Sequence, residues 1–564
     1  MTDPSARRRW PLLACIAIYL GLALANGLVW ENAHDEGVTF HQAIGHNWLT
    51  HDASQPVPVS EAYRWIDGSR AHAPHDVVAA LVDPDARGMH PPAYYLFVNQ
   101  WGRRVGTGTL RLRLPAYLAG VLSLIAIGLL AQRLVPRPEA ALAAPLLLAL
   151  SPWFVSFSNY ARPYAIALCI ALWSTHWMLE LVSAPATTRR RAGFAALSLL
   201  GLYTIYHYAF VLAWQAAILG VSALRRGPGR RGPAVAALVA MGSAVVAGYL
   251  PWIPHLLAHL RVVQAPDLYF HGAIPPGRWL ATAGSTLRTF ALAEVGSESR
   301  ALTLGLAALG ILTLPFVLAR FRPATQAALP PPARLVWYLM PLLPLLLVVA
   351  DLVNDSKTIA YTKTSFPLLP LLILGVVGGI CGAPSRGARS AGLAAWVLLF
   401  AIGSAVNLDR RIEQRTDFER VAAELAKADD GSHVVVLSSN LPGYAIPLLL
   451  SFRDAGIHNL RLLQAPGPEL GAAVRTLRQR ADVRRVTLIR FEIPYARGLV
   501  ASGNPFLKES QGWSGAQLRA VAHEAQAAGW KVGELDSAAP TPADSSRRRM
   551  LAIAPGVRVK YFSM

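Results

Sequence analysis

Long apolar runs separated by short polar connectors constrain this chain more than any other feature of its sequence. Most runs are long enough to cross a hydrocarbon layer of about 30 Å as a helix that rises about 1.5 Å per residue. Only 15% of the 564 residues are charged, whereas soluble chains carry about 25%. This composition excludes a soluble enzyme, a disordered protein and a nucleic-acid-binding module. We predict a polytopic α-helical membrane protein with about eleven spans, at residues 11–30, 112–133, 139–157, 163–182, 192–207, 208–224, 234–252, 301–319, 334–350, 365–382 and 391–408.

The net charge of +20 comes from basic residues that gather in alternate connectors. Membrane proteins keep such clusters on the cytoplasmic side, so we expect a cytoplasmic N-terminus, an outside C-terminus and no nucleic-acid partner. The first run follows Arg7–Arg9 and is interpreted as a retained anchor. The orientation depends on residues 192–224, which we interpret as two helices that turn near Tyr206–Tyr208. One long tilted helix is the alternative, and it would reverse every later loop.

The composition changes after residue 408. Short apolar segments at 434–439, 460–464 and 485–491 have the pattern of buried strands, and helical patterns alternate with them. Such alternation predicts a small C-terminal α/β domain with a largely parallel sheet. We therefore divide the chain into a transmembrane module, 1–409, and a soluble domain, 410–564. The module has two long outer loops, 31–111 and 253–300, whose aromatic and basic residues are typical of interfacial helices.

Two adjacent carboxylates, Asp35 and Glu36, follow the first span directly. At the membrane surface they would be partly desolvated and would repel each other, and both effects raise a carboxylate pKa. A raised pKa suits a general base. The alternative is an ordinary charge pair at a helix end in a solvated loop.

Three basic residues lie in connectors on the same predicted side. His90 is held ahead of a double proline, where an imidazole could bind phosphate or a metal, or cap a helix. Arg162 lies between the third and fourth spans, and its planar fork of donors suits phosphate or carboxylate. A structural salt bridge to the first loop is the alternative. Lys363 opens the tenth span and could meet an anionic headgroup or simply snorkel.

Four motifs occur in order along the chain: Asp-Glu after the first span, His-Pro-Pro-x-Tyr-Tyr at 90–95, Leu-Arg-Leu-Pro at 112–115, and Arg-Pro-Tyr at 162–164 after Ser-Pro. This ordered set, over about residues 10–410, resembles the family 39 glycosyltransferases. These are GT-C fold relatives of protein O-mannosyltransferases and lipid A aminoarabinose transferases. The resemblance implies transfer of a sugar from a polyprenyl-phosphate carrier to an acceptor on the outer face. A soluble C-terminal domain outside the membrane is usual in bacterial members.

The resemblance also implies roles for individual residues. Asp35 matches the acidic residue that faces donor and acceptor, with Glu36 as its neighbour. The position before Pro-Pro contributes to the donor-phosphate region, and aminoarabinose transferases have Glu-Lys there. This chain has Met89-His90, a departure that argues against a Glu-dependent metal site and against aminoarabinose specificity. Lys363 takes the place of the basic residue, often Arg, in the last catalytic loop.

The predicted function is sugar transfer from a polyprenyl-phosphate donor to a cell-envelope acceptor (lipid, glycan or protein) at the periplasmic face of a bacterial inner membrane. Direct displacement would invert the anomeric centre. No cofactor is assigned, and a divalent metal is left open. The alternatives are a flippase or transporter of lipid-linked sugars, and a scaffold whose C-terminal domain holds the function. The site residues are catalytic Asp35 and Glu36, with His90, Arg162, Tyr164 and Lys363 at the donor phosphate.

Overall fold

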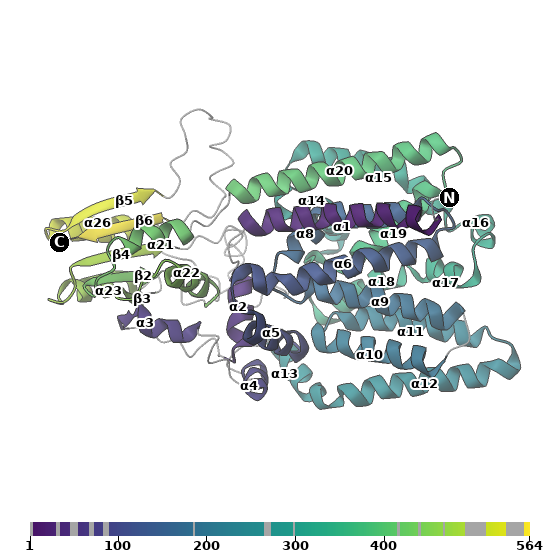
Figure 1. Ribbon diagram of the computed structural model, residues 1–564, viewed down its shortest axis with the longest axis horizontal. Helices are drawn as coiled ribbons and strands as arrows, with labels where there is room; N and C mark the ends of the chain where they lie inside the picture. Colours follow the sequence, from purple (N-terminus) through teal and green to yellow (C-terminus); the bar gives the residue numbers. More distant parts are fainter. Residues whose placement is uncertain are drawn as a thin grey trace.

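The protein is described by a computed structural model (Figure 1). It describes residues 4–29, 34–45, 55–66, 73–82, 90–183, 187–263, 272–296, 299–413, 418–437, 442–465, 469–490, 515–536 and 558–563.

A bundle of long apolar helices forms most of the molecule, which is a multi-pass membrane protein. Within the described ranges, seven helical segments are long and apolar enough to span a membrane, or eight if the pair α7–α8, bent by 60°, is one span. Two shorter apolar helices, α11 and α19, and helix α10 account for the rest of the predicted spans. The bundle helices are α1 (Pro4–Val29), α6 (Thr109–Leu134), α7 (Ala140–Leu150), α8 (Pro152–Ser158), α9 (Tyr164–Ser183), α10 (Thr188–Thr204), α11 (Tyr208–Leu224), α12 (Pro228–Tyr249), α15 (Arg300–Ala319), α17 (Pro331–Leu339), α18 (Leu342–Asn354), α19 (Leu368–Cys381) and α20 (Arg386–Glu413).

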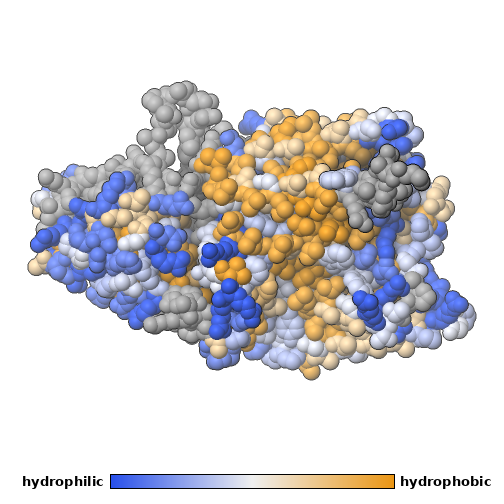
Figure 2. Space-filling model, viewed as in Figure 1, coloured by the Kyte–Doolittle hydropathy of each residue, from blue (hydrophilic) through white to orange (hydrophobic). Residues whose placement is uncertain are grey.

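The predicted turn in the stretch 192–224 is confirmed, because α10 ends at Thr204 and α11 begins at Tyr208. Figure 1 shows the N-terminus and the C-terminal sheet at opposite ends of the bundle. We call the end next to the sheet the sheet end. An apolar belt covers the bundle between these ends in Figure 2, while polar residues gather at the ends themselves. This distribution is the one a bilayer requires of a multi-span protein.

The C-terminal sheet has six strands in the order β1-β3-β2-β4-β6-β5. The three predicted strands form its parallel centre, and antiparallel strands flank them, so the sheet is mixed rather than largely parallel. Helical patterns expected between the strands correspond to α21 (Phe418–Ala426), α22 (Pro442–Asp454), α23 (Leu470–Arg478) and α26 (Gly515–Ala527). The strands are β1 (Val57–Pro58), β2 (His433–Leu437), β3 (Arg461–Gln464), β4 (Arg485–Arg490), β5 (Lys531–Asp536) and β6 (Arg558–Ser563).

Strand β1 belongs to the first long loop, so the sheet contains residues from both predicted domains. The backbone N–H of Val59 donates to the carbonyl of Leu460 at 2.7 Å. One continuous apolar core joins the loop to the domain, with Phe40 and Phe452 fully enclosed in it. Figure 1 shows α2 beside α22. The loop helices are α2 (His34–Ala43), α3 (Val59–Ala62), η1 (Tyr63–Trp65), α4 (Pro74–Val82) and α5 (Pro92–Val105).

The second long loop and the short connectors also contain helices. The amphipathic interfacial helices expected in the loop 253–300 stay a prediction, because η4 has no buried residue and α13 continues the candidate span Pro228–Arg261. The helices of these segments are η3 (Leu250–Trp252), α13 (Ile253–Val263), η4 (Pro276–Arg278), α14 (Trp279–Gly296), α16 (Pro323–Ala327) and η5 (Thr358–Ala360).

The buried His433 makes the stability of the C-terminal domain depend on pH. Its Nε2 lies 2.8 Å from the hydroxyl of Thr487 on the neighbouring strand, and its Nδ1 lies 3.2 Å from the carbonyl of Ala428. Burial lowers the pKa of His433 from 6.5 to about 4, although the Ala428 carbonyl opposes the shift. The unfolded chain therefore binds a proton between these pH values that the folded domain does not bind, and stability falls as pH drops from 6.5 toward 4.

We predict that amide protection in β2 and β4 of the full-length protein weakens by about 3 kcal/mol between pH 7 and pH 4. His433→Gln cannot be protonated and should remove most of this dependence. Hydrogen–deuterium exchange, expressed as protection factors, measures both proteins. Equal pH dependence in the two would exclude His433 as its origin.

Candidate active site

Four segments meet at the sheet end of the bundle and bring most of the predicted site residues together. They are the start of α2, the start of α5, the first turns of α6, and the connector between α8 and α9. Proline fixes one of them, because Pro91 is the extended N-cap of α5 and Pro92 is its first residue. The site is therefore built from helix ends.

An ion pair between Glu36 and Arg113 lies at the centre of this region. The guanidinium donates from Nε to Oε1 at 2.9 Å and from Nη2 to Oε2 at 2.8 Å. Arg113 is fully buried and Glu36 is 4% exposed. Two parallel charge-assisted hydrogen bonds are the strong geometry for such a pair. Glu36 therefore does not belong to a solvated charge pair at a helix end.

The same ion pair connects further segments. Glu36 Oε1 also accepts the backbone N–H of Ala161 at 2.9 Å, and Arg113 Nη1 donates to the carbonyl of Gly27 at 3.3 Å. The end of α1, the start of α2, α6 and the α8–α9 connector are thus held by one buried pair. The role of Arg113, part of the Leu-Arg-Leu-Pro motif, was not predicted from the sequence. An arginine within an apolar run normally has a partner, and this was the available signal.

A close approach of α1 to the connector reinforces this arrangement. The hydroxyl of Tyr117 donates to Oδ1 of Asn159 at 2.6 Å, and Asn159 Nδ2 donates to the carbonyl of Val155. A Cβ at Gly27 would lie 2.4 Å from the Tyr117 hydroxyl and 2.9 Å from Asn159 Oδ1. Only glycine fits there, so the end of α1 can pass directly over the connector.

Arg162, in the connector, makes hydrogen bonds to both α2 and α5. Its Nη1 donates to the hydroxyls of Thr39 at 3.1 Å and Tyr95 at 3.2 Å. Its Nη2 lies 3.2 Å from His90 Nε2. A guanidinium can only donate, so His90 accepts at Nε2 and carries its proton on Nδ1. The His90 ring stacks on Tyr95, with centroids 5.7 Å apart. We call Thr39, His90, Tyr95 and Arg162 the arginine cluster.

Two tyrosines complete this wall of the site. Tyr94 is 4% exposed, and its ring meets Tyr95 edge-on at 5.6 Å. Burial raises the pKa of the Tyr94 phenol well above its usual range, with neighbouring Tyr95 adding to the effect. The phenol is therefore neutral at physiological pH. Tyr164, the first residue of α9, is also buried and packs edge-on against Phe157 at 5.3 Å.

Asp35 and Lys363 are the two remaining predicted site residues. The structure places Asp35 only by its position in the chain, and it places Lys363 beside Tyr361. Asp35 lies in the first turn of α2, and its side chain is outside the described residues. Lys363 is half-buried in the turn before α19. Burial raises the pKa of the nearby Tyr361 phenol, and the Lys363 ammonium group opposes this shift. Among the side chains that the structure describes, no group of three or more His, Cys, Asp and Glu could hold a metal ion.

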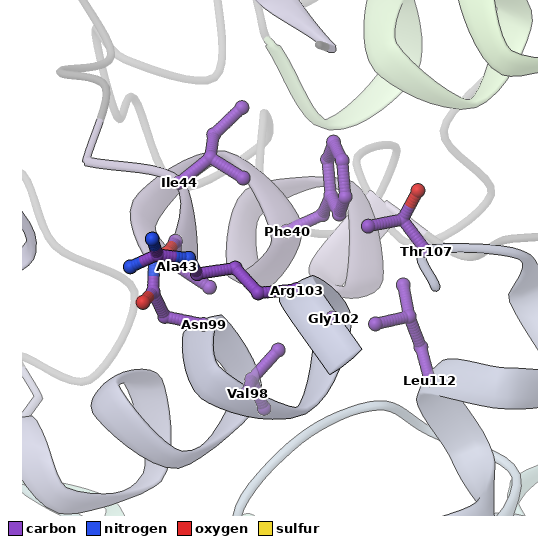
Figure 3. A pocket seen from close by; sticks show the side chains of 9 residues that line it. All are labelled: Phe40, Ala43, Ile44, Val98, Asn99, Gly102, Arg103, Thr107 and Leu112. Atoms are coloured by element: carbon purple, nitrogen blue, oxygen red, sulfur yellow. The ribbon is translucent and has the colours of Figure 1, made fainter. Parts of the chain in front are cut away.

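A small hollow between α2 and α5 lies one turn beyond this site (Figure 3). It has room for about one water molecule, so it is a packing gap and not a site for a lipid or a sugar. Asn99 lines it and donates from Nδ2 to the carbonyl of Ala43 at 2.8 Å. The lining residues are Phe40, Ala43, Ile44, Val98, Asn99, Gly102, Arg103, Thr107 and Leu112.

Comparison with solved structures finds similar chains at low sequence identity. ArnT from Cupriavidus metallidurans in the apo state has a TM-score of 0.49 and 14% identity, over 99% of this chain and 98% of that chain. ArnT bound to undecaprenyl phosphate has a TM-score of 0.48 and 13% identity, over 97% and 98%. The archaeal oligosaccharyltransferase AglB from Archaeoglobus fulgidus, in complex with an inhibitory peptide and a dolichol-phosphate, has a TM-score of 0.44 and 9% identity, over 86% and 70%. No protein-family model and no curated protein matches the sequence.

The buried ion pair generates a prediction about stability. Arg113→Met should destabilise the protein by about 3–5 kcal/mol, because it leaves the Glu36 carboxylate buried without its counter-charge. The double variant Glu36→Gln with Arg113→Met should recover most of that loss. Thermal unfolding in one detergent compares the three proteins. If Arg113→Met melts like wild type, the pair does not hold the four segments together.

Proposed function

We propose that this protein is a GT-C-type membrane glycosyltransferase that uses a polyprenyl-phosphate-linked sugar. The acceptor would be a lipid, glycan or protein of the cell envelope, at the periplasmic face of a bacterial inner membrane. The observation that carries the proposal is the arginine cluster at the sheet end. The cluster includes Thr39, which lies on the same helix as Asp35. The motif resemblance over residues 10–410 supports the same conclusion.

The proposed reaction has a simple charge balance. An acceptor hydroxyl or amine attacks the anomeric carbon, Asp35 takes the acceptor proton, and the bond from that carbon to the phosphate oxygen breaks. The electron pair leaves with the phosphate, whose growing negative charge needs preorganised donors. Arg162 and the Nδ1–H group of His90 are suited to supply them. Backside displacement at this carbon inverts its configuration.

Glu36 takes a different role from Asp35 in this proposal. Its carboxylate is neutralised by Arg113 and accepts the N–H of Ala161, so we assign it to positioning the start of α2. Tyr164 and Lys363 are assigned to the donor headgroup, Lys363 from the turn before α19. Residues 1–409 would form the catalytic module. Residues 410–564 would form a periplasmic domain that supports the first loop through their shared core.

Asp35→Asn should lower kcat by about 100-fold or more, since a positioned base contributes about 10²–10⁴-fold. Transfer is measured with purified protein in lipid vesicles, radiolabelled polyprenyl-phosphate sugars and an extract of envelope acceptors. Asp454→Asn, which removes an exposed charge on α22, is the matched control. Full activity of Asp35→Asn would remove this residue from the mechanism. Translocation of lipid-linked sugar without any transfer would favour the flippase.

Arg162→Ala should lower kcat/KM for the donor by about 10–100-fold, because a hydrogen bond to a charged group contributes about 1.5–3 kcal/mol. Arg162→Lys should recover only part of this loss, since an ammonium group lacks the planar fork of donors. The exposed Arg104 on α5 offers a matched charge-removing control, Arg104→Ala. Equal kinetics for Arg162→Ala and Arg104→Ala would contradict the assignment.

A further inference from the structure

A buried carboxylate in the last turn of α18 organises the loop that follows it. Asp351 is 1% exposed, and its position near a helix C-terminus is unfavourable for a negative charge. Both oxygens are nevertheless satisfied. Oδ1 accepts from the hydroxyl of Ser356 at 2.6 Å, from the N–H of Thr358 at 2.7 Å and from the Thr358 hydroxyl, and Oδ2 accepts the N–H of Ile359 at 2.9 Å. The carboxylate thus folds residues 356–359 back onto the helix end.

The folded loop is fixed to the second long loop on its other side. The carbonyl of Asp355 accepts the N–H of Gly272 at 2.7 Å, and the carbonyl of Ile359 accepts the hydroxyl of Thr286 on α14 at 2.9 Å. The side chain of Ile359 packs in a small buried cluster with Ile274. The loop is therefore held at three points that depend on the conformation set by Asp351.

This loop carries two of the basic residues at the sheet end. A Cβ at Gly272, which has a φ of 103°, would lie 3.2 Å from Lys357 Nζ, so this ammonium group lies directly against the glycine. Lys363 lies within a turn in which the Thr364 hydroxyl donates to the carbonyl of Tyr361 at 2.7 Å and also contacts the carbonyl of Thr358. The Asp351 contacts thus hold the segment that carries Lys357, and the Thr364 hydroxyl links the turn of Lys363 to that segment.

The loop and the arginine cluster lie at the same end of the bundle. Phe210, in the first turn of α11, packs on the cluster that contains Ile359. The hydroxyl of Tyr206, just before α11, lies 2.6 Å from His259 Nδ1, and His259 Nε2 lies 3.0 Å from the carbonyl of Leu81 on α4. These contacts place the loop beside the helices of the first long loop, which also contribute His90 and Tyr95.

We infer that Asp351 is a positioning residue that shapes the 355–364 loop so that its lysines bind the phosphate of the lipid-linked donor. Asp351 itself does not touch the donor. The position requires a hydrogen-bond acceptor with two oxygens, because four hydrogen-bond donors converge on the Asp351 carboxylate. An amide in its place would direct an N–H group against one of these four donors. This inference rests on the proposed function and extends it to a second group of basic residues, Lys357 and Lys363.

Binding of polyprenyl phosphate and transfer kinetics, both on full-length protein in nanodiscs, test this role. Asp351→Asn should weaken polyprenyl-phosphate binding about tenfold and raise the donor KM by a similar factor, with kcat within about threefold of wild type. Amide exchange in residues 356–364 should accelerate in parallel. Asp351→Glu should recover part of the affinity. Asn354→Ala, on the exposed side of the same turn, should match wild type.

Other outcomes decide against the inference. Wild-type affinity and KM in Asp351→Asn, with faster loop exchange, would show that loop order does not serve binding. Equal losses in Asn354→Ala would show a general effect on the helix end. If Asp351→Asn does not fold, Thr358→Val, which removes one donor, should change binding in the same direction by less, and an unchanged affinity would overturn the inference. Absence of transfer by wild type would reject the proposed function alone, because the binding comparison still decides the role of Asp351.

Discussion

The pairing of Glu36 with Arg113 is the interaction on which the sheet end depends. Removing both charges from water is costly, and each is tolerated only because the other supplies two short hydrogen bonds. The ion pair also has a structural consequence. Because the carboxylate also accepts a backbone N–H from the α8–α9 connector, the arginine of α6 determines where that connector lies. Arg162 then reaches the hydroxyl of Thr39, one turn beyond Glu36 on α2. The ion pair therefore determines the geometry of the arginine cluster.

Helix geometry also separates the two adjacent acids. Successive residues of an α-helix point about 100° apart, and in the first turn of α2 the Glu36 side chain points to the buried Arg113. In the proposed reaction Glu36, which is bound to a buried guanidinium, positions the start of α2, and Asp35 is the proposed base. One dipeptide would then provide both a structural anchor and, in the proposed mechanism, the base.

The periodicity of the sequence was sufficient to predict the helices of the membrane bundle. It was insufficient to predict the edge strands of the sheet. Each predicted span coincides with a helix or a bent pair, and the uncharged stretch 192–224 does break where its aromatic residues lie. Strands β2, β3 and β4 are apolar and were predicted, whereas β1 is two residues long and β5 and β6 mix charged with apolar residues. For the site, His90 and Arg162 contact each other, and the role given to each stays a prediction. The partner of Arg113 was missed because the pairing joins residues far apart in the chain, and Asp35 and Lys363 stay predictions.

Strand β1 imposes an order on biosynthesis. Val57 pairs with Leu462, and every bundle helix after α1 lies between them in the chain. The first loop therefore leaves the ribosome long before its partner strand exists, and its apolar residues Val59, Ala62 and Ile66, which are enclosed in the mature protein, must wait uncovered. Contacts of such sequence separation form late and slowly. Until translation ends, this part of the first loop lacks its support, so an incompletely synthesised chain would carry the membrane bundle without the completed sheet.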